Sequence, residues 1–267
     1  MAVDLSALIA DLMAEGDALA AVLQQAVSDR GEAVWHLPSS AVPWTVQNQL
    51  VHLAWNDEAA QLAMADPERF RAQRPDTPEG IQAMVDGAIR AHAHREGSAV
   101  LEWFQTARRS LADTARVRLS GDRVPWYGPD MSVASKLTAR LMETWAHGYD
   151  IAEAIGTPTE PTDRVAHVAF LGLRAVPNAF AARNRPTPTE PVSALLRLPS
   201  GGSLVVGDPA AADRVTGDAY ELALVVTQRR HRNDTTLVAV GPVADEWLSI
   251  AQAFAGPPGT GRAATAR

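Results

Sequence analysis

The sequence has 267 residues, of which 46% are hydrophobic and 21% are charged, and its formal net charge is −7. A chain of this length and composition is typical of a soluble protein with one large core or two smaller ones. The negative net charge argues against nucleic acid as a main partner. No apolar run approaches the ~18 residues of a membrane span, and no signal pattern opens the chain, so we expect a cytoplasmic protein.

The sequence contains no cysteine. Disulfides, a protein thiolate nucleophile and a cysteine-based zinc site are therefore excluded, and any thiol chemistry must use a thiol supplied from outside. Among the 24 basic residues only Lys136 is a lysine, so a Schiff-base mechanism has one candidate amine. This bias toward arginine, together with abundant alanine, suggests a GC-rich genome such as that of an actinobacterium.

The first 155 residues are predicted to be almost wholly helical because apolar residues recur at helical spacing. Thr45 and Ser132 are suitable N-caps, and Gly156 is a suitable helix end. Four principal helices and one additional segment predict a helical bundle over 1–156. The predicted helices cover 3–28, 46–65, 78–95, 99–117 and 133–155.

A change of composition at 156–163, which is rich in Pro and Thr, marks the best domain boundary. Beyond it we expect a smaller α+β domain over 164–255, with a helix that Pro177 kinks or breaks. A flexible tail is expected over 256–267. The predicted elements are helices at 164–183, 218–230 and 244–255, and strands at 191–198, 203–208 and 235–241.

Three residues carry the main functional signal: His52, Glu143 and His147. Glu143 and His147 are four residues apart, so on a helix their side chains leave the same face about 6 Å apart. If His52 arrives from a second helix, two imidazoles and one carboxylate can hold a divalent metal with an open coordination position.

Each of these residues also has a structural explanation. His52 lies in a largely apolar run, where a histidine is commonly a hydrogen-bonded core residue. Glu143 and His147 share a helical stripe with Lys136, Arg140 and Asp150, and such a stripe is also typical of a solvated helix face.

Two segments resemble the signatures of the DinB-like metal-binding bundle, and more narrowly the mycothiol-dependent maleylpyruvate isomerase family with its actinobacterial relatives. They are WTVQNQLVHLAWNDE at 44–58 and TWAHGYDIAEAIG at 144–156. The resemblance implies zinc bound by His52, Glu143 and His147. It also implies a fold that is mainly α, a DinB-like four-helix bundle followed by a C-terminal α+β domain. The ending WLSIAQAFAGPPGTGR is closer to an uncharacterised metal-binding branch than to the isomerase itself.

The same resemblance implies that an arginine of the C-terminal domain serves the active site, and the register places Arg229 there, with Arg230 second. An arginine fork binds a carboxylate through two hydrogen bonds. The alternative is that these cations simply follow a helix C-terminus, where positive charge is favoured. Asp57 and Asp150 are weaker candidates for orienting the ligand imidazoles.

The segment GPPGTGR at 256–262 matches the glycine spacing of a phosphate-binding loop. Arg262 replaces the lysine of that motif, Ala263 replaces its hydroxyl residue, and too few residues follow for the required helix. We therefore expect no nucleotide site.

These features predict an enzyme in which zinc activates a low-molecular-weight thiol such as mycothiol. The reaction is either isomerisation of a maleylpyruvate-like acid or thiol S-transfer to an electrophile. Iron or another divalent metal, with oxidative or hydrolytic chemistry, is an alternative. A non-catalytic protein that binds a metal or a thiol conjugate is another. The expected partners are the thiol and a small anionic or electrophilic substrate, with the protein a monomer or homodimer.

Overall fold

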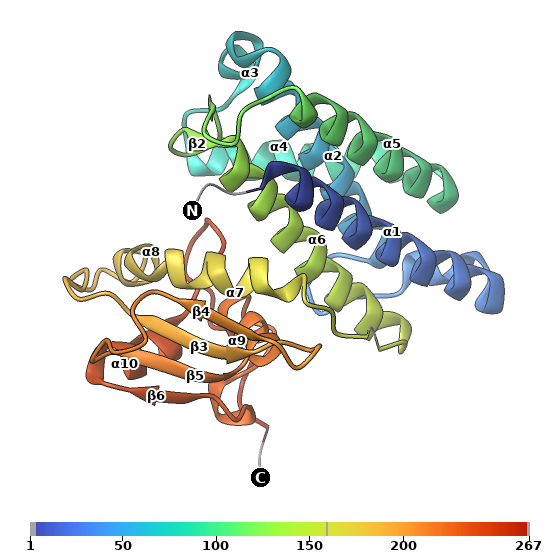
Figure 1. Ribbon diagram of the computed structural model, residues 1–267. Coiled ribbons are helices and arrows are strands. Elements are labelled where there is room, and N and C mark those ends of the chain that lie inside the picture. The colour runs from blue at the N-terminus through green and yellow to red at the C-terminus, as the bar shows by residue number, and fades with distance from the viewer. Residues whose placement is uncertain (1–3, 159, 266–267) are drawn as a thin grey trace. The chain divides into compact units, whose positions relative to one another are not determined.

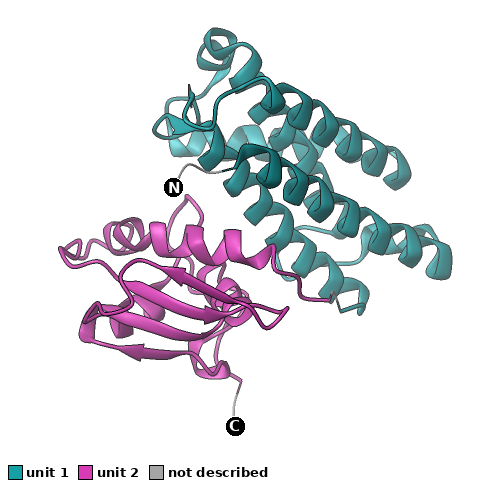
Figure 2. Cartoon of the chain, viewed as in Figure 1, with its two compact units in different colours: residues 1–159 teal, residues 160–267 magenta. Residues whose placement is uncertain are grey.

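The computed structural model describes residues 4–158 and 160–265. The chain forms two compact units, residues 1–159 and residues 160–267 (Figure 2). Within the described residues, no helix is both long enough and apolar enough to cross a membrane.

The first unit is a helical bundle (Figure 1). In it α1 packs on α5 and α6, and α2 packs on the same two helices. The helices are α1 (Leu5–Arg30), α2 (Val46–Ala65), α3 (Pro67–Gln73), α4 (Pro78–His92), α5 (Gly97–Arg116) and α6 (Val133–Ile155), with a 3-10 turn at Glu32–His36. A short antiparallel hairpin joins α5 to α6 and consists of β1 (Arg123–Val124) and β2 (Met131–Ser132).

The ends of α2 and α6, the helices that bear the predicted ligands, follow from local chemistry. The Thr45 hydroxyl accepts the backbone N–H of Asn48, and the Asn48 side chain accepts the backbone N–H of Thr45. The Ser132 hydroxyl accepts the backbone N–H of Ser135 at the start of α6, and Gly156 ends the helix with a φ of 69°, a conformation that glycine adopts easily. These three helix boundaries were predicted correctly.

The bundle core is formed by the inward stripes of its four long helices. Leu12 of α1, Leu50 and Leu53 of α2, Phe104 of α5 and Leu141 of α6 are all completely buried. Burying such side chains is the main stabilising contribution to a bundle, at about 1.5–3 kcal/mol each. By contrast α4 buries no residue completely, so it lies on the surface of this unit.

A close approach explains why a glycine begins α5. A Cβ on Gly97 would lie 2.3 Å from the ring of Trp35, which is itself almost completely buried. Any other residue at this position would displace the tryptophan or the helix.

The second unit combines a four-stranded sheet with helices. The sheet order is β4-β3-β5-β6, with β3 and β5 parallel and the other neighbours antiparallel. The strands are β3 (Ser193–Arg197), β4 (Ser203–Val206), β5 (Arg214–Asp218) and β6 (Val238–Val240). The helices are α7 (Val165–Arg174), α8 (Val176–Ala181), α9 (Ala219–Val226) and α10 (Pro242–Ile250), with a 3-10 turn at Arg232–Asp234.

The structure confirms one predicted helix break and contains elements that the sequence prediction did not include. The break between α7 and α8 at Ala175 confirms the effect of Pro177, which stands in the first turn of α8. The helix α3 was missed, although Asp66 caps it and Pro67 begins it. The strand β5 was also missed, because Val215 is the only apolar residue in its sequence RVTGD.

Candidate metal centre

The structure brings His52 of α2 together with Glu143 and His147 of α6. The Nε2 atoms of His52 and His147 lie 3.5 and 3.4 Å from the same oxygen, Oε2 of Glu143. One ligand atom from each residue can be chosen so that all three lie within 4.8 Å of one another. Their side chains are 14%, 25% and 11% exposed in the order His52, Glu143, His147, so the cluster is sheltered but reachable.

The donor set and its spacing suit a divalent metal. Ligand atoms placed about 2.0–2.1 Å from a tetrahedral zinc ion lie about 3.3–3.4 Å from one another. The two His–Glu separations, 3.5 and 3.4 Å, are close to that value. Three protein donors would leave one position open, which is the arrangement of catalytic rather than structural zinc sites.

Burial also favours the protonation states that metal binding requires. Burial lowers the pKa of His52 to about 4, outweighing the hydrogen bond to Glu143, which raises that pKa. This imidazole is therefore neutral near pH 7. Burial would raise the pKa of Glu143, but the hydrogen bonds from His147 and His52 outweigh it and hold that pKa well below its usual value. Neutral imidazoles and an ionised carboxylate are the forms that bind metal.

A glutamine that the sequence reasoning missed orients His147. The completely buried Gln49 of α2 places its Oε1 atom 2.7 Å from Nδ1 of His147. Because this carbonyl oxygen can only accept, Nδ1 of His147 donates to it, and Nε2 is the ring nitrogen that would bind a metal. The signal in the sequence was a polar residue one helical turn before His52, but Gln47 and Asn48 beside it are polar too, so it did not stand out.

Trp44 and Asn56 complete the surroundings of the cluster. The Trp44 ring lies 4.9 Å from the His52 ring and 5.9 Å from the His147 ring, measured between centroids. The Asn56 amide donates to the His52 carbonyl at 3.0 Å and packs against its imidazole. These contacts restrict rotation of both imidazoles, which favours a preformed site.

The two aspartates proposed to orient the imidazoles have other partners. Asp57 is completely buried and accepts hydrogen bonds from Nε of Arg108 at 2.7 Å and from Nε of Arg140 at 3.0 Å. Gln49 makes an orienting contact to His147. Asp150 accepts a hydrogen bond from the Ser40 hydroxyl at 2.9 Å.

The polar stripe of α6 is not a solvated face. Lys136, Arg140, His147 and Asp150 are all buried, and Glu143 is mostly covered. The solvated-face alternative is therefore wrong. Periodicity could not reveal this, because partners of the stripe such as Gln49 and Asp57 come from α2, which is distant in the sequence.

Comparison with known proteins identifies the family. The model of the mycothiol maleylpyruvate isomerase N-terminal domain matches residues 6–152, which is more than half of the chain. The chain belongs to this family. Two uncharacterised proteins of Mycobacterium tuberculosis, from strains CDC 1551 and H37Rv, are each 40% identical over 254 residues, covering 95% of this chain and 97% of theirs.

Solved structures of the family share the fold. The crystal structure of the mycothiol-dependent maleylpyruvate isomerase aligns with a TM-score of 0.56 at 15% identity, and that of a histidine-to-alanine mutant aligns with 0.58 at 14%. Each alignment covers 89% of this chain and 93% of the other. The mainly helical architecture predicted from sequence, with its smaller α+β part, is therefore confirmed as the family fold.

The family-implied arginines lie in the second unit, in the turn after α9, which ends at Val226. Nη1 of Arg229 donates to the Thr227 carbonyl at 2.7 Å, and both Arg229 and Arg230 are half-buried. Arg232 has a structural role, because it binds the carboxylate and carbonyl of Asp245.

The glycine-rich segment near the C-terminus shows no phosphate-loop architecture. Residues 256–265 form no helix or strand in the described chain. Nη2 of Arg183 donates to the Gly259 carbonyl at 3.0 Å, and the Thr265 N–H donates to the Asp234 carboxylate.

Proposed function

We propose that this protein is a metal-dependent enzyme that uses a small thiol, mycothiol or a close analogue, to attack an electrophilic organic acid. The observation that carries the proposal is the convergence of two imidazole nitrogens on one carboxylate oxygen, at 3.4 and 3.5 Å, in a partly open position. Membership of the mycothiol maleylpyruvate isomerase family supports it. The absence of cysteine supports it too, since the nucleophilic sulfur must come from a cosubstrate.

In this proposal His52, Glu143 and His147 hold the metal, for which zinc suits two imidazoles and one carboxylate. A divalent ion bound there supplies a Lewis acid that lowers the pKa of a thiol in its open position. Gln49 keeps His147 in the tautomer that presents Nε2, and Trp44 shields the two imidazoles on one side.

The thiolate then adds to the carbon–carbon double bond of the acid, and the electron pair of that bond moves onto the conjugated carbonyl. Rotation about the resulting single bond and expulsion of the thiolate restore the double bond in the other geometry, which is isomerisation. Protonation of the same adduct at carbon instead gives a stable thioether, which is S-transfer. Both outcomes use the same thiol addition, so both belong to this proposal.

Arg229, with Arg230 second, is the proposed ligand of the substrate carboxylate. A guanidinium fork offers two parallel N–H groups to the two oxygens of a carboxylate.

The test supplies maleylpyruvate to metal-replete protein freed of thiol, with and without added mycothiol, and identifies products by NMR. We expect thiol-dependent formation of either the trans isomer or the thioether. Undiminished turnover without thiol would overturn the proposal in favour of hydrolytic or oxidative metal chemistry. Thiol binding without turnover on maleylpyruvate or a panel of unsaturated acids would also overturn it, in favour of a binding protein.

A further inference from the structure

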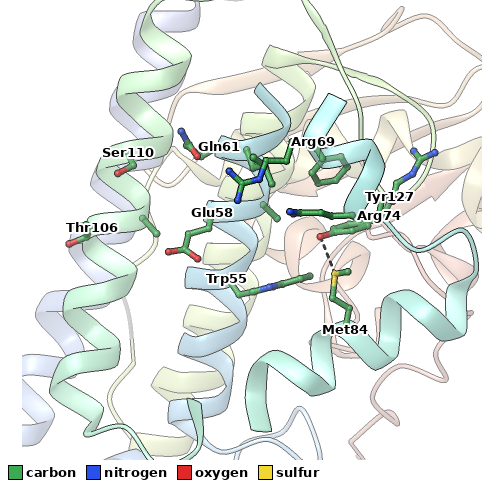
Figure 3. A pocket seen from close by; sticks show the side chains of 14 residues that line it. Trp55, Glu58, Gln61, Arg69, Arg74, Met84, Thr106, Ser110 and Tyr127 are labelled. Carbon is green, nitrogen blue, oxygen red and sulfur yellow. Dashed lines mark hydrogen bonds between the residues drawn. The ribbon is translucent and has the colours of Figure 1, made fainter. Parts of the chain in front are cut away.

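The first unit contains a cavity of about 490 Å³, whose lining includes none of the three metal-binding candidates. Its walls come from α2, α3, α4, α5 and the loop residue Tyr127 (Figure 3). This volume is within the usual range for sites that hold small molecules, about 300–1,000 Å³. Its lining includes both aromatic and charged side chains.

Part of the lining is aromatic. The rings of Trp55 and Tyr127 are nearly parallel, with 12° between their planes and 6.0 Å between centroids. Phe70 packs on Tyr127 at 5.2 Å, and the Tyr127 hydroxyl donates to the Met84 sulfur at 3.7 Å (Figure 3). Flat, polarisable walls of this kind suit a planar apolar group.

The charged side chains of the lining carry a cationic excess. The Arg69 guanidinium makes no hydrogen bond or ion pair with any described residue. Arg74 uses one nitrogen, Nη1, to donate to the Trp126 carbonyl at 2.6 Å. The only acidic residue in the lining is Glu58, and one of its oxygens already accepts the Trp103 indole N–H at 2.6 Å.

Two arginines against one glutamate give this cavity a local positive charge, although the whole chain has a net charge of −7. An unpaired guanidinium beside an aromatic wall can bind a carboxylate through two hydrogen bonds while the wall accepts the body of the ligand. A neutral planar molecule would leave the positive charge uncompensated, and a cation would be repelled by it.

We propose that this cavity is a second binding site, distinct from the metal centre, for a small planar carboxylate. Arg69 binds the carboxylate, with Arg74 beside it, and the rings of Trp55 and Tyr127 hold the flat body. The inference does not depend on the proposed thiol chemistry, because no metal-binding candidate lines the cavity.

The test measures binding of 2-naphthoate to the full-length, metal-replete protein by calorimetry, with the uncharged 2-naphthamide as the matched ligand. We expect one naphthoate site per chain and binding of the amide weaker by at least about tenfold, the usual effect of losing a hydrogen bond between charged groups. Equal binding of the two ligands would overturn the proposal, since it would show that the cavity binds the apolar ring and does not recognise the carboxylate.

Variants on the same short helix provide matched controls. Arg69→Met should weaken naphthoate binding by about tenfold or more. Arg71→Met should leave it unchanged, because Arg71 does not line the cavity and pairs with Asp130 at 3.2 Å. Glu58→Gln should strengthen binding several-fold, a gain that damage to the fold cannot produce. Equal losses in the two arginine variants, or weaker binding by Glu58→Gln, would contradict the assignment.

Location is tested separately. His147→Ala should bind naphthoate as the parent does, because its side chain belongs to the metal centre. The ¹³C-labelled methyl signal of Met84, assigned by its loss in Met84→Leu, should shift on titration. Loss of binding in His147→Ala, or an unmoved Met84 signal at saturation, would place the anion elsewhere and reject this site.

Discussion

At the scale of single residues, the metal centre depends on groups that the ligand pattern does not include. Gln49 is the clearest case, since its carbonyl oxygen lies 2.7 Å from Nδ1 of His147 and fixes which ring nitrogen is free. Side chains that orient a ligand imidazole commonly change metal affinity by about 10- to 100-fold when they are removed.

Gln49→Leu should therefore lower metal affinity by about 10- to 100-fold, measured by competition with a chelator. Gln49→Glu should retain most of the affinity, because a carboxylate still accepts the Nδ1 proton. Unchanged affinity in Gln49→Leu would show that the contact has no role in metal binding.

Lys136, the only lysine of the chain, is another residue whose environment the sequence did not reveal. It is 1% exposed, and its Nζ atom makes no hydrogen bond with any described residue and lies 3.1 Å from the centroid of the Trp126 ring. Burial, assisted by the nearby Arg140, lowers its pKa to about 5. The amine is therefore neutral near pH 7 in the folded protein.

The pH dependence of stability follows from this shift. Between about pH 5 and pH 10 the unfolded chain holds a proton on Lys136 that the folded protein does not, so this residue makes stability rise with pH. Lys136→Met should flatten that slope and raise the free energy of unfolding at pH 7 by about 1–3 kcal/mol. Urea denaturation at several pH values measures both effects, and a less stable variant with the slope unchanged would contradict the account.

At the scale of elements, the site requires α2 and α6 to pack in one register. Asp57 of α2 joins Arg140 of α6 to Arg108 of α5, and Nη2 of Arg108 also donates to the Thr144 hydroxyl at 2.7 Å. All four of these side chains are buried. Arg140 stands one turn before Glu143, so this network fixes the part of α6 that bears the carboxylate.

Asp57→Asn would leave two buried guanidinium groups without a counter-charge. The free energy of unfolding should fall by about 3–5 kcal/mol, the usual cost of removing one partner from a buried ion pair. Asp113→Asn is the matched control, because Asp113 pairs with Arg116 at the surface, and its effect should stay within about 0.5 kcal/mol. Similar denaturation midpoints for the two variants would show that the network does not anchor these helices.

Local sequence signals were sufficient to predict the ends of the helices that bear the metal-binding candidates. Thr45, Ser132 and Gly156 act on their own neighbours, so their effects can be predicted without knowledge of the fold. The partner of Asp57 could not be predicted in this way, because Arg108 is 51 residues away and meets it only after the bundle packs. The strand β5 escaped prediction for a similar reason: its pairing with β3 and β6, rather than its own sequence, makes it a strand.

At the scale of the whole molecule, the proposed function draws on both units. The bundle carries the metal-binding candidates, and the second unit carries the arginines that the family resemblance implies. The roles of the two units can be tested separately, because the bundle residues should affect metal content and the arginines should affect substrate binding.

Arg229→Met should reduce kcat/KM by about 30- to 1000-fold, equivalent to about 2–4 kcal/mol, while metal content stays the same. Arg229→Lys should restore little, because an ammonium lacks the planar fork. Arg232→Met serves as the control, since Arg232 is held by Asp245 and should affect stability instead. Parent-like kinetics in both Arg229→Met and Arg230→Met would confine the chemistry to the bundle.

The most direct test of the central claim is the metal content of the purified protein and of two ligand variants, measured by elemental analysis with helicity checked by circular dichroism. The account predicts close to one zinc per chain in the parent, and loss of the metal in His52→Ala and His147→Ala while both remain helical. Full zinc retention in both variants would contradict it.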